Sequence, residues 1–461
     1  MLGIVLIFTT LILLIFLAYR GVSLLLAAPA LAAVAAFLNG APVLASYTQV
    51  FMEAMGRFVV AYFPLFLMGA LFGRLMGESG AARTIGHRTV SALGQRNAIL
   101  AIIVCCAVLT YGGVSLFVVA FAVFPIAKAL FEAADIPARL IPGTIALGAF
   151  TFTMTALPGT PAIQNAIPMP YFGTTAFAAP WLGLTAAAVM ALVGYGWLKY
   201  RERQARQAGE GFGGCHGADE QAATDSTPRP TDPTLSKALL PIVLVLALNL
   251  VLSIWLLPAF DYSFLREPEW GGIEPASVIG VWAIIVSLVV ACLSVLATNP
   301  RLFRTLLDAM SPGAQDALMP MFNTASLVGF GAVIAALPAF GVLKEMILAI
   351  SPGNPLISLS VSINILAGIT GSASGGMSIA LEALGERYLA LGNAAGIDPA
   401  VLHRVTAVAT GGLDALPHNG AVVTLLAICG MTHAKSYLDV LVVAVIGPVL
   451  SLAVIVGIAS L

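Results

Sequence analysis

The stretch Thr155-Ala-Leu-Pro-Gly-Thr-Pro-Ala-Ile163 has a counterpart 259 residues later, in Asp414-Ala-Leu-Pro-His-Asn-Gly-Ala-Val422. The two share Ala-Leu-Pro and a later alanine. Two further pairs lie upstream in the same order and at nearly the same offset: 111–115 with 370–374, and 133–140 with 394–402. Three ordered matches at almost one offset indicate an internal repeat. We therefore divide the chain into a first repeat (1–198), a linker (199–237) and a second repeat (238–461).

The composition predicts that most of this chain lies in lipid. Hydrophobic residues make up 59% of the 461 residues and charged residues 9%, with a mean hydropathy of +0.99. An average soluble domain carries about 25% charged residues, and a helix needs about 20 apolar residues to cross a bilayer. Apolar runs of roughly this length recur along the sequence at 2–18, 22–38, 58–77, 179–198, 239–257, 277–297 and 436–460. We expect an all-α polytopic membrane protein.

The distribution of charge predicts how the chain is oriented. The linker begins directly after an apolar run with a group of cations, Lys199, Arg201, Arg203 and Arg206. Cationic loops stay in the cytoplasm, so we place the linker and the 78–97 loop inside, and the acid-rich 261–274 loop outside. Counting helices from these anchors puts both termini on the periplasmic face. The two repeats then start on opposite sides, so they are expected to be inverted, as in many secondary transporters.

Each repeat contains polar interruptions at membrane depth. The apolar segment 98–131 is broken at Thr110–Ser115, and both of its ends reach cations expected inside, so it suits a re-entrant hairpin. The segment 138–172 is too long for one plain span and is interrupted at Ala156–Pro161. The second repeat has a hairpin broken at Thr370–Ser378 and a helix broken at Asp414–Gly420. Irregular backbone at this depth is tolerated only where it is buried in protein or lines a cavity.

The four interruptions are expected to converge on one anion-binding site. Half-helices that restart after a break offer unpaired N–H groups and a positive dipole end. Glycine allows close approach to that backbone, and Ser, Thr and Asn add donors. Since no Arg or Lys lies inside the breaks, affinity is expected to come from these neutral groups. The candidate substrate-binding residues are Tyr111, Gly112, Gly113, Ser115, Thr155, Gly159, Thr160, Gln164, Asn165, Gly371, Ser372, Ser374, Gly375, His418 and Asn419. The alternative is that glycine and serine serve close helix packing and that proline merely kinks the helices.

Asp414 and His418 are the candidate proton-coupling residues. Asp414 is an acid inside an apolar segment, with His418 four residues later. Intramembrane acids are costly and commonly act as proton or ion relays, and histidine titrates near neutral pH. The alternative is a structural Asp414 that accepts backbone N–H groups at the break.

The sequence resembles the gluconate permease family, the gluconate:proton symporters of bacteria, which belong to the ion transporter superfamily. The resemblance rests on TYGGVSLFVVAFAVFPIAKALF (110–131), RLIPGTIALGAFTFTMTALPGTPAIQNAIP (139–168) and GGLDALPHNGAVVTLL (411–426). It implies an inner-membrane, elevator-type carrier, usually a homodimer, with 98–175 and 355–432 in the mobile transport domain. It also implies proton-coupled symport of a small carboxylate, a gluconate-like aldonate or a hydroxy acid such as 3-hydroxybutyrate.

Other functions are weighed against this one. Sodium-coupled transport of a di- or tricarboxylate such as citrate is the main alternative, because carbonyls freed at the breaks suit sodium. A channel would need a continuous polar pore. The chain has no GxxxxGK[ST] motif, and its five cysteines and five histidines lack metal-ligand spacing, so we expect neither an enzyme nor a metal or other cofactor. The net charge of −1 argues against a nucleic-acid partner.

Overall fold

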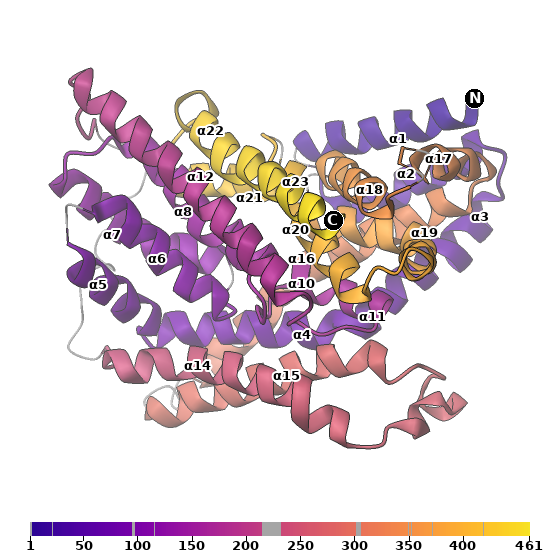
Figure 1. Ribbon diagram of the computed structural model, residues 1–461, viewed down its shortest axis with the longest axis horizontal. Helices are drawn as coiled ribbons and strands as arrows, with labels where there is room; N and C mark the ends of the chain where they lie inside the picture. Colours follow the sequence, from indigo (N-terminus) through magenta and orange to yellow (C-terminus); the bar gives the residue numbers. More distant parts are fainter. Residues whose placement is uncertain are drawn as a thin grey trace.

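The computed structural model is all-helical in the residues it describes, which are 2–20, 22–94, 97–114, 116–213, 232–300, 306–348, 350–351, 353–370, 372–417 and 419–461. Figure 1 shows α14 (Leu235–Val251) and α15 (Ala276–Thr298) lying together along one side of the molecule, next to α4 (Met52–Glu78). The expected all-α architecture is confirmed for these residues.

Six continuous helical stretches in the described residues are long and apolar enough to span a membrane: Val43–Glu78, Pro180–Gln207, Leu235–Ala259, Ala276–Thr298, Ser311–Ala336 and His433–Ala459. The first joins α3 (Val43–Ala45), the π-helix η1 (Ser46–Phe51) and α4. The third continues α14 through η4 (Leu252–Leu256) and η5 (Leu257–Ala259). The last comprises α22 (His433–Leu441), η9 (Val442–Ile446) and α23 (Gly447–Ala459). Two shorter apolar helices, α1 (Leu2–Tyr19) and α2 (Leu24–Leu38), precede them.

Three of these stretches differ from the sequence expectation. The stretch Val43–Glu78 begins well before the expected apolar run 58–77. The helix α16 (Leu306–Ala336) was not among the expected spans, because Gln315, Asp316 and Asn323 interrupt its apolar run. The helix α12 (Pro180–Gln207) continues nine residues past the expected boundary at 198. Its last turns are held by charge, since Arg201 donates from Nε to Asp439 at 2.9 Å.

The chain that follows α12 is also tied down by an ion pair. Arg139, in η3 (Ala138–Leu140), donates from Nε to Glu210 at 2.7 Å, and this hydrogen bond holds the pKa of the Glu210 carboxyl below its usual value. The structure at the end of the first repeat therefore extends into the segment expected to be a linker.

The first repeat contains both expected interruptions. The helix α5 (Ala81–Leu93) leads into a hairpin of α6 (Ala98–Tyr111) and α7 (Leu116–Ala133). Gly113 turns the hairpin tip at φ +95°, where a Cβ atom would come within 2.9 Å of the Pro161 ring. The broken helix then follows as α8 (Ile141–Ala149), α9 (Phe152–Thr155), α10 (Ile163–Ala166) and α11 (Pro168–Phe172). The tip of the hairpin thus packs against the break in the next helix.

The second repeat shows the same order of elements. The turns η6 (Ser263–Arg266) and η7 (Pro268–Trp270) come first, followed by α15, α16 and α17 (Pro338–Leu348). A hairpin then forms from α18 (Pro355–Thr370) and α19 (Ala373–Ala394). The broken helix is α20 (Pro399–Leu413) and α21 (Gly420–Ile428). Pro158 and Pro417 both lie in the non-helical breaks, as expected. Proline lacks the N–H group that continues a helix, which explains why both helices break there.

Candidate functional site

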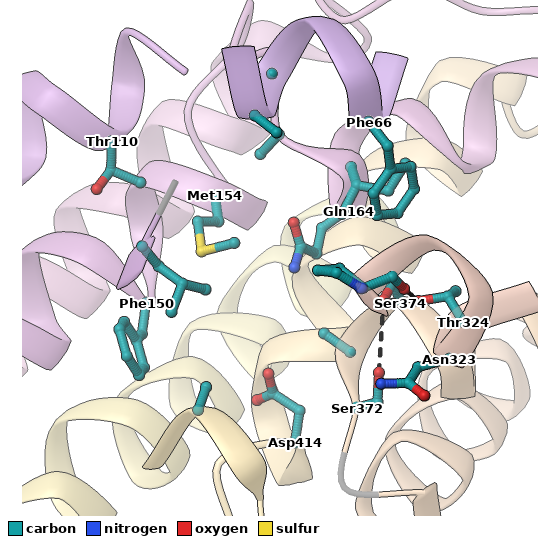
Figure 2. A pocket seen from close by; sticks show the side chains of 18 of the residues that line it. Phe66, Thr110, Phe150, Met154, Gln164, Asn323, Thr324, Ser372, Ser374 and Asp414 are labelled. Atoms are coloured by element: carbon teal, nitrogen blue, oxygen red, sulfur yellow. Dashed lines mark hydrogen bonds between the residues drawn. The ribbon is translucent and has the colours of Figure 1, made fainter. Parts of the chain in front are cut away.

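A cavity of about 500 Å³ lies where the two hairpin tips and the two helix breaks meet α4 and α16. Figure 2 shows side chains from all of these parts facing one space, among them Gln164, Ser372, Asn323 and Asp414. Seven of the expected site residues line it: Gly113, Thr155, Gln164, Ser372, Ser374, Asp414 and Asn419. The polar interruptions of both repeats therefore converge, although they lie about 260 residues apart in the chain.

Six expected residues are not among those that line this cavity: Tyr111, Gly112, Gly159, Thr160, Asn165 and Gly375. Tyr111 donates from its hydroxyl to the Pro158 carbonyl at 2.7 Å, across to the neighbouring break. A Cβ atom on Gly159 would come within 2.5 Å of the Phe177 ring, and one on Gly112 within 2.7 Å of Ile242. Both glycines are therefore closely packed against their neighbours. Ser115, Gly371 and His418 lie outside the described residues.

Asn165 is fully buried and its amide is used within the protein. Its Nδ2 donates to the carbonyls of Thr160 and Ala176, both at 3.0 Å. Its Oδ1 accepts from Arg404 at 3.1 Å and lies 3.2 Å from Nε2 of His403. Asn165 therefore holds the broken helix in place, while its neighbour Gln164 faces the cavity.

Several polar atoms at the cavity wall have no hydrogen-bond partner among the described residues. They are the Oε1 atom of Gln164, the Oγ1 atom of Thr110 and the Oδ1 atom of Asn323. Gln164 is 8% exposed and Thr110 is 4% exposed. Buried polar groups normally have hydrogen-bond partners. These atoms therefore suit a polar ligand, from which Gln164 and Asn323 would accept hydrogen bonds.

The second repeat contributes two helix starts to the cavity. Ser372 caps α19 by accepting from the Gly375 N–H at 3.1 Å, and Asn419 caps α21 by accepting from Ala421 at 2.6 Å and Val422 at 3.0 Å. The first residues of both helices line the cavity wall. Helix N-termini carry a partial positive charge that favours anions. Asn419 thus combines a structural cap with a place at the site.

Asp414 follows the last residue of α20 and faces the cavity (Figure 2). The break around it is fixed by bonds to backbone carbonyls: Asn419 Nδ2 donates to the Asp414 carbonyl at 2.7 Å, and the Tyr437 hydroxyl donates to that of Ala415 at 3.2 Å. Asp316 of α16 is the other ionisable side chain among the described lining residues, and its carboxyl lies 4.0 Å from Nη1 of Arg74. No lysine or arginine occurs among these lining residues.

A cation nevertheless lies directly behind the wall, which sequence reasoning missed. Arg404, in the middle of α20, is fully buried and makes five hydrogen bonds. Its acceptors are the carbonyls of Thr155, Ala176 and Ala178 and the Oδ1 atom of Asn165, at 2.9–3.3 Å. Next to it, Nδ1 of His403 lies 2.6 Å from the Thr174 hydroxyl. The signal was present, since an ionisable pair within an otherwise apolar segment is a functional candidate.

The described residues contain no group of three His, Cys, Asp or Glu side chains placed to hold a metal ion. The described lining offers hydrogen-bonding groups, two helix N-termini and two carboxyl groups, those of Asp316 and Asp414.

Comparison with known proteins shows to which family the chain belongs. No protein-family model matches the sequence. The fold is similar to that of MtrF from Neisseria gonorrhoeae, which is described with a class of antimetabolite efflux pumps, at a TM-score of 0.55 and 14% identity over 90% of this chain and 84% of that one. The uncharacterised transporter YxjC of Bacillus subtilis is 45% identical over 453 residues, which are 96% of each chain. The chain therefore belongs to the same family as YxjC, and it is a polytopic membrane transporter.

Proposed function

We propose that this transporter carries a small organic anion together with a proton, in the manner of the gluconate permeases that its sequence resembles. The observation that carries the proposal is the placement of Asp414. It lies in a cavity bounded by both hairpin tips and both helix breaks, beside unpartnered amide oxygens and two helix N-termini. Keeping a carboxyl group ionised inside a membrane costs free energy, and acids in such places usually have a function.

The lining suits a hydroxylated carboxylate. The N–H groups at the starts of α19 and α21 and the hydroxyl of Ser374 provide donors for a carboxylate. The free oxygens of Gln164 and Asn323 provide acceptors for substrate hydroxyl groups. A gluconate-like aldonate and a small hydroxy acid such as 3-hydroxybutyrate both have this pattern of groups.

Protonation of Asp414 as the anion enters would keep the loaded site from carrying an extra buried negative charge. The anion and its proton then cross together. The two hairpins and broken helices, within 98–175 and 355–432, would form the moving part of an elevator. The protein would act as a homodimer in the bacterial inner membrane, with the linker in the cytoplasm and both termini in the periplasm.

Uptake by proteoliposomes tests the proposal. Radiolabelled gluconate and 3-hydroxybutyrate are offered under an inward proton gradient, an inward sodium gradient, or neither. We expect accumulation only with the proton gradient. Accumulation driven by sodium alone, or a preference for citrate over both probes, would contradict the proposal and favour a sodium-coupled di- or tricarboxylate carrier.

A further inference from the structure

Arg404 differs from the other fully buried charges. In the described residues three Asp, Glu, Arg or Lys side chains are buried: Glu202, Arg404 and Asp439. Glu202 pairs with Lys199 and with Arg206, the latter at 3.1 Å, and Asp439 pairs with Arg139 at 3.3 Å and Arg201 at 2.9 Å. All five hydrogen bonds of Arg404 go to neutral oxygens. The described residues therefore provide no ion-pair partner for Arg404.

Burying Arg404 without a negatively charged partner costs free energy. Guanidinium groups stay protonated in proteins, and a charge without an opposite charge nearby is costly at membrane depth. The carbonyl oxygens around Arg404 lower that cost through their dipoles, but they leave its net charge in place. An anion that binds close by would be stabilised by this charge, and would stabilise Arg404 in return.

The contacts of Arg404 connect it to the cavity. Thr155, whose carbonyl accepts from Nη1 at 3.2 Å, lines the cavity itself. Asn165, which accepts from the same nitrogen at 3.1 Å, is adjacent to the lining residue Gln164. On the far side Gly183 of α12 leaves no room, because a Cβ atom there would lie 3.1 Å from Arg404 Nε. Arg404 thus lies one layer behind the wall and does not touch the cavity.

We infer that Arg404 is the fixed counter-charge for a substrate with a single negative charge, acting through the cavity wall as a positioning and specificity-determining residue. The inference rests on the proposed function, because it assumes that the substrate is an organic anion. One fixed positive charge favours one carboxylate over a neutral analogue, and also over a dicarboxylate whose second charge would have no partner. The competing explanation is that Arg404 only clamps Ala176 and Ala178 to Thr155 across the break.

Two sets of probes keep the carbon chain and vary the charge by exchanging one end group. The six-carbon set is gluconamide, gluconate and glucarate, and the four-carbon set is 3-hydroxybutyramide, 3-hydroxybutyrate and malate, with charges of zero, minus one and minus two. Binding of each probe is measured by the thermal shift of the purified full-length protein. The variants are Arg404→Lys, which keeps the charge, and Arg404→Gln, which removes the charge and keeps an amide donor.

We expect the wild type to bind the monoanion of one set at least about ten-fold more tightly than the amide or the dianion. Arg404→Lys should keep this order. Arg404→Gln should weaken monoanion binding at least about ten-fold, as expected for the loss of a charge in a site of low dielectric constant, and leave amide binding unchanged. Equal weakening of monoanion and amide would identify a structural clamp and overturn the inference, as would an unchanged preference in folded Arg404→Gln.

The wild-type series remains decisive if neither variant folds. Dianion binding as tight as monoanion binding would contradict a single counter-charge while leaving anion transport intact. Failure of every carboxylate to bind the wild type would instead overturn the proposed function and, with it, the role of Arg404.

Discussion

Two carboxyl groups line the cavity, and replacing each by an amide separates their roles. Asp414→Asn mimics a permanently protonated acid, so we expect it to abolish accumulation driven by a proton gradient while substrate exchange across the membrane persists. Asp316→Asn is the matched control, because the Asp316 side chain is 62% exposed and lies near Arg74; it should still accumulate substrate. The measurement is uptake and counterflow in proteoliposomes. Accumulation by Asp414→Asn at the wild-type level would make Asp414 a structural residue.

Gln164 and Asn165 are neighbours in α10 with opposite expected phenotypes. Gln164→Ala removes a side chain that faces the cavity, and we expect a roughly ten-fold rise in KM, because a buried substrate hydroxyl left without its acceptor costs about 1–3 kcal/mol. Asn165→Ala removes one hydrogen-bond partner from the Thr160 carbonyl and one from Arg404, and a buried group left unsatisfied costs about 1–3 kcal/mol. It should therefore lower thermal stability first. The opposite pattern, with a stable Asn165→Ala that binds weakly, would place Asn165 at the substrate.

From the sequence alone, the segments that form the candidate site were easier to predict than the direction in which each side chain points. Polar residues at the breaks could be assigned to the region, but a helix turns by about 100° per residue, so adjacent residues such as Gln164 and Asn165 point in different directions. In a helix of only four residues no periodic pattern distinguishes them. Arg404 was missed for another reason. It lies inside α20, ten residues before the break at Asp414, and only polar residues in the breaks were considered.

At the scale of elements, α12 provides a matched pair of glycines. A Cβ atom on Gly183 would collide with the Ala156 carbonyl and press on Arg404, whereas one on Gly196 would meet nothing within 4 Å. We expect Gly183→Ala to reduce both thermal stability and uptake. Gly196→Ala should be neutral or should stabilise by about 0.5–1 kcal/mol, because alanine favours a helix interior. Equal effects of both substitutions would mean that α12 does not press against the break.

Element order was predictable wherever proline, glycine and repeated spacing marked a break. Both hairpins and both broken helices occur at the expected places, with Pro158 and Pro417 in the breaks. The span α16 was not predictable by apolar length, because its polar residues Asp316, Asn323 and Thr324 face the cavity. A spanning helix that lines a polar site necessarily looks less hydrophobic than one that faces lipid on all sides. The residues that concealed this helix are therefore the ones that give it a role.

For the whole molecule, the cavity is shared by parts far apart in sequence, and an ion pair connects two of them at another point. Arg57 of α4 donates from Nη2 to Glu382 of α19 at 2.8 Å, and the Tyr171 hydroxyl donates to the same carboxylate at 3.1 Å. These two contacts hold α4 and the Tyr171 hydroxyl against α19 at a point away from the cavity lining.

The helix α20 carries a fixed cation at Arg404, and the acid Asp414 directly follows its last residue, ten residues and thus about 15 Å further along its axis. With Asp414 ionised and no substrate bound, this pair of charges sums to zero; with Asp414 protonated and a monoanion bound, the sum is again zero. Moving one net charge through a membrane potential of 100 mV costs about 2.3 kcal/mol, and neither form would bear that cost. We therefore expect uptake at a fixed pH gradient to stay within about two-fold when a potassium diffusion potential is imposed with valinomycin. A rate that follows the voltage would show that net charge moves with each substrate molecule.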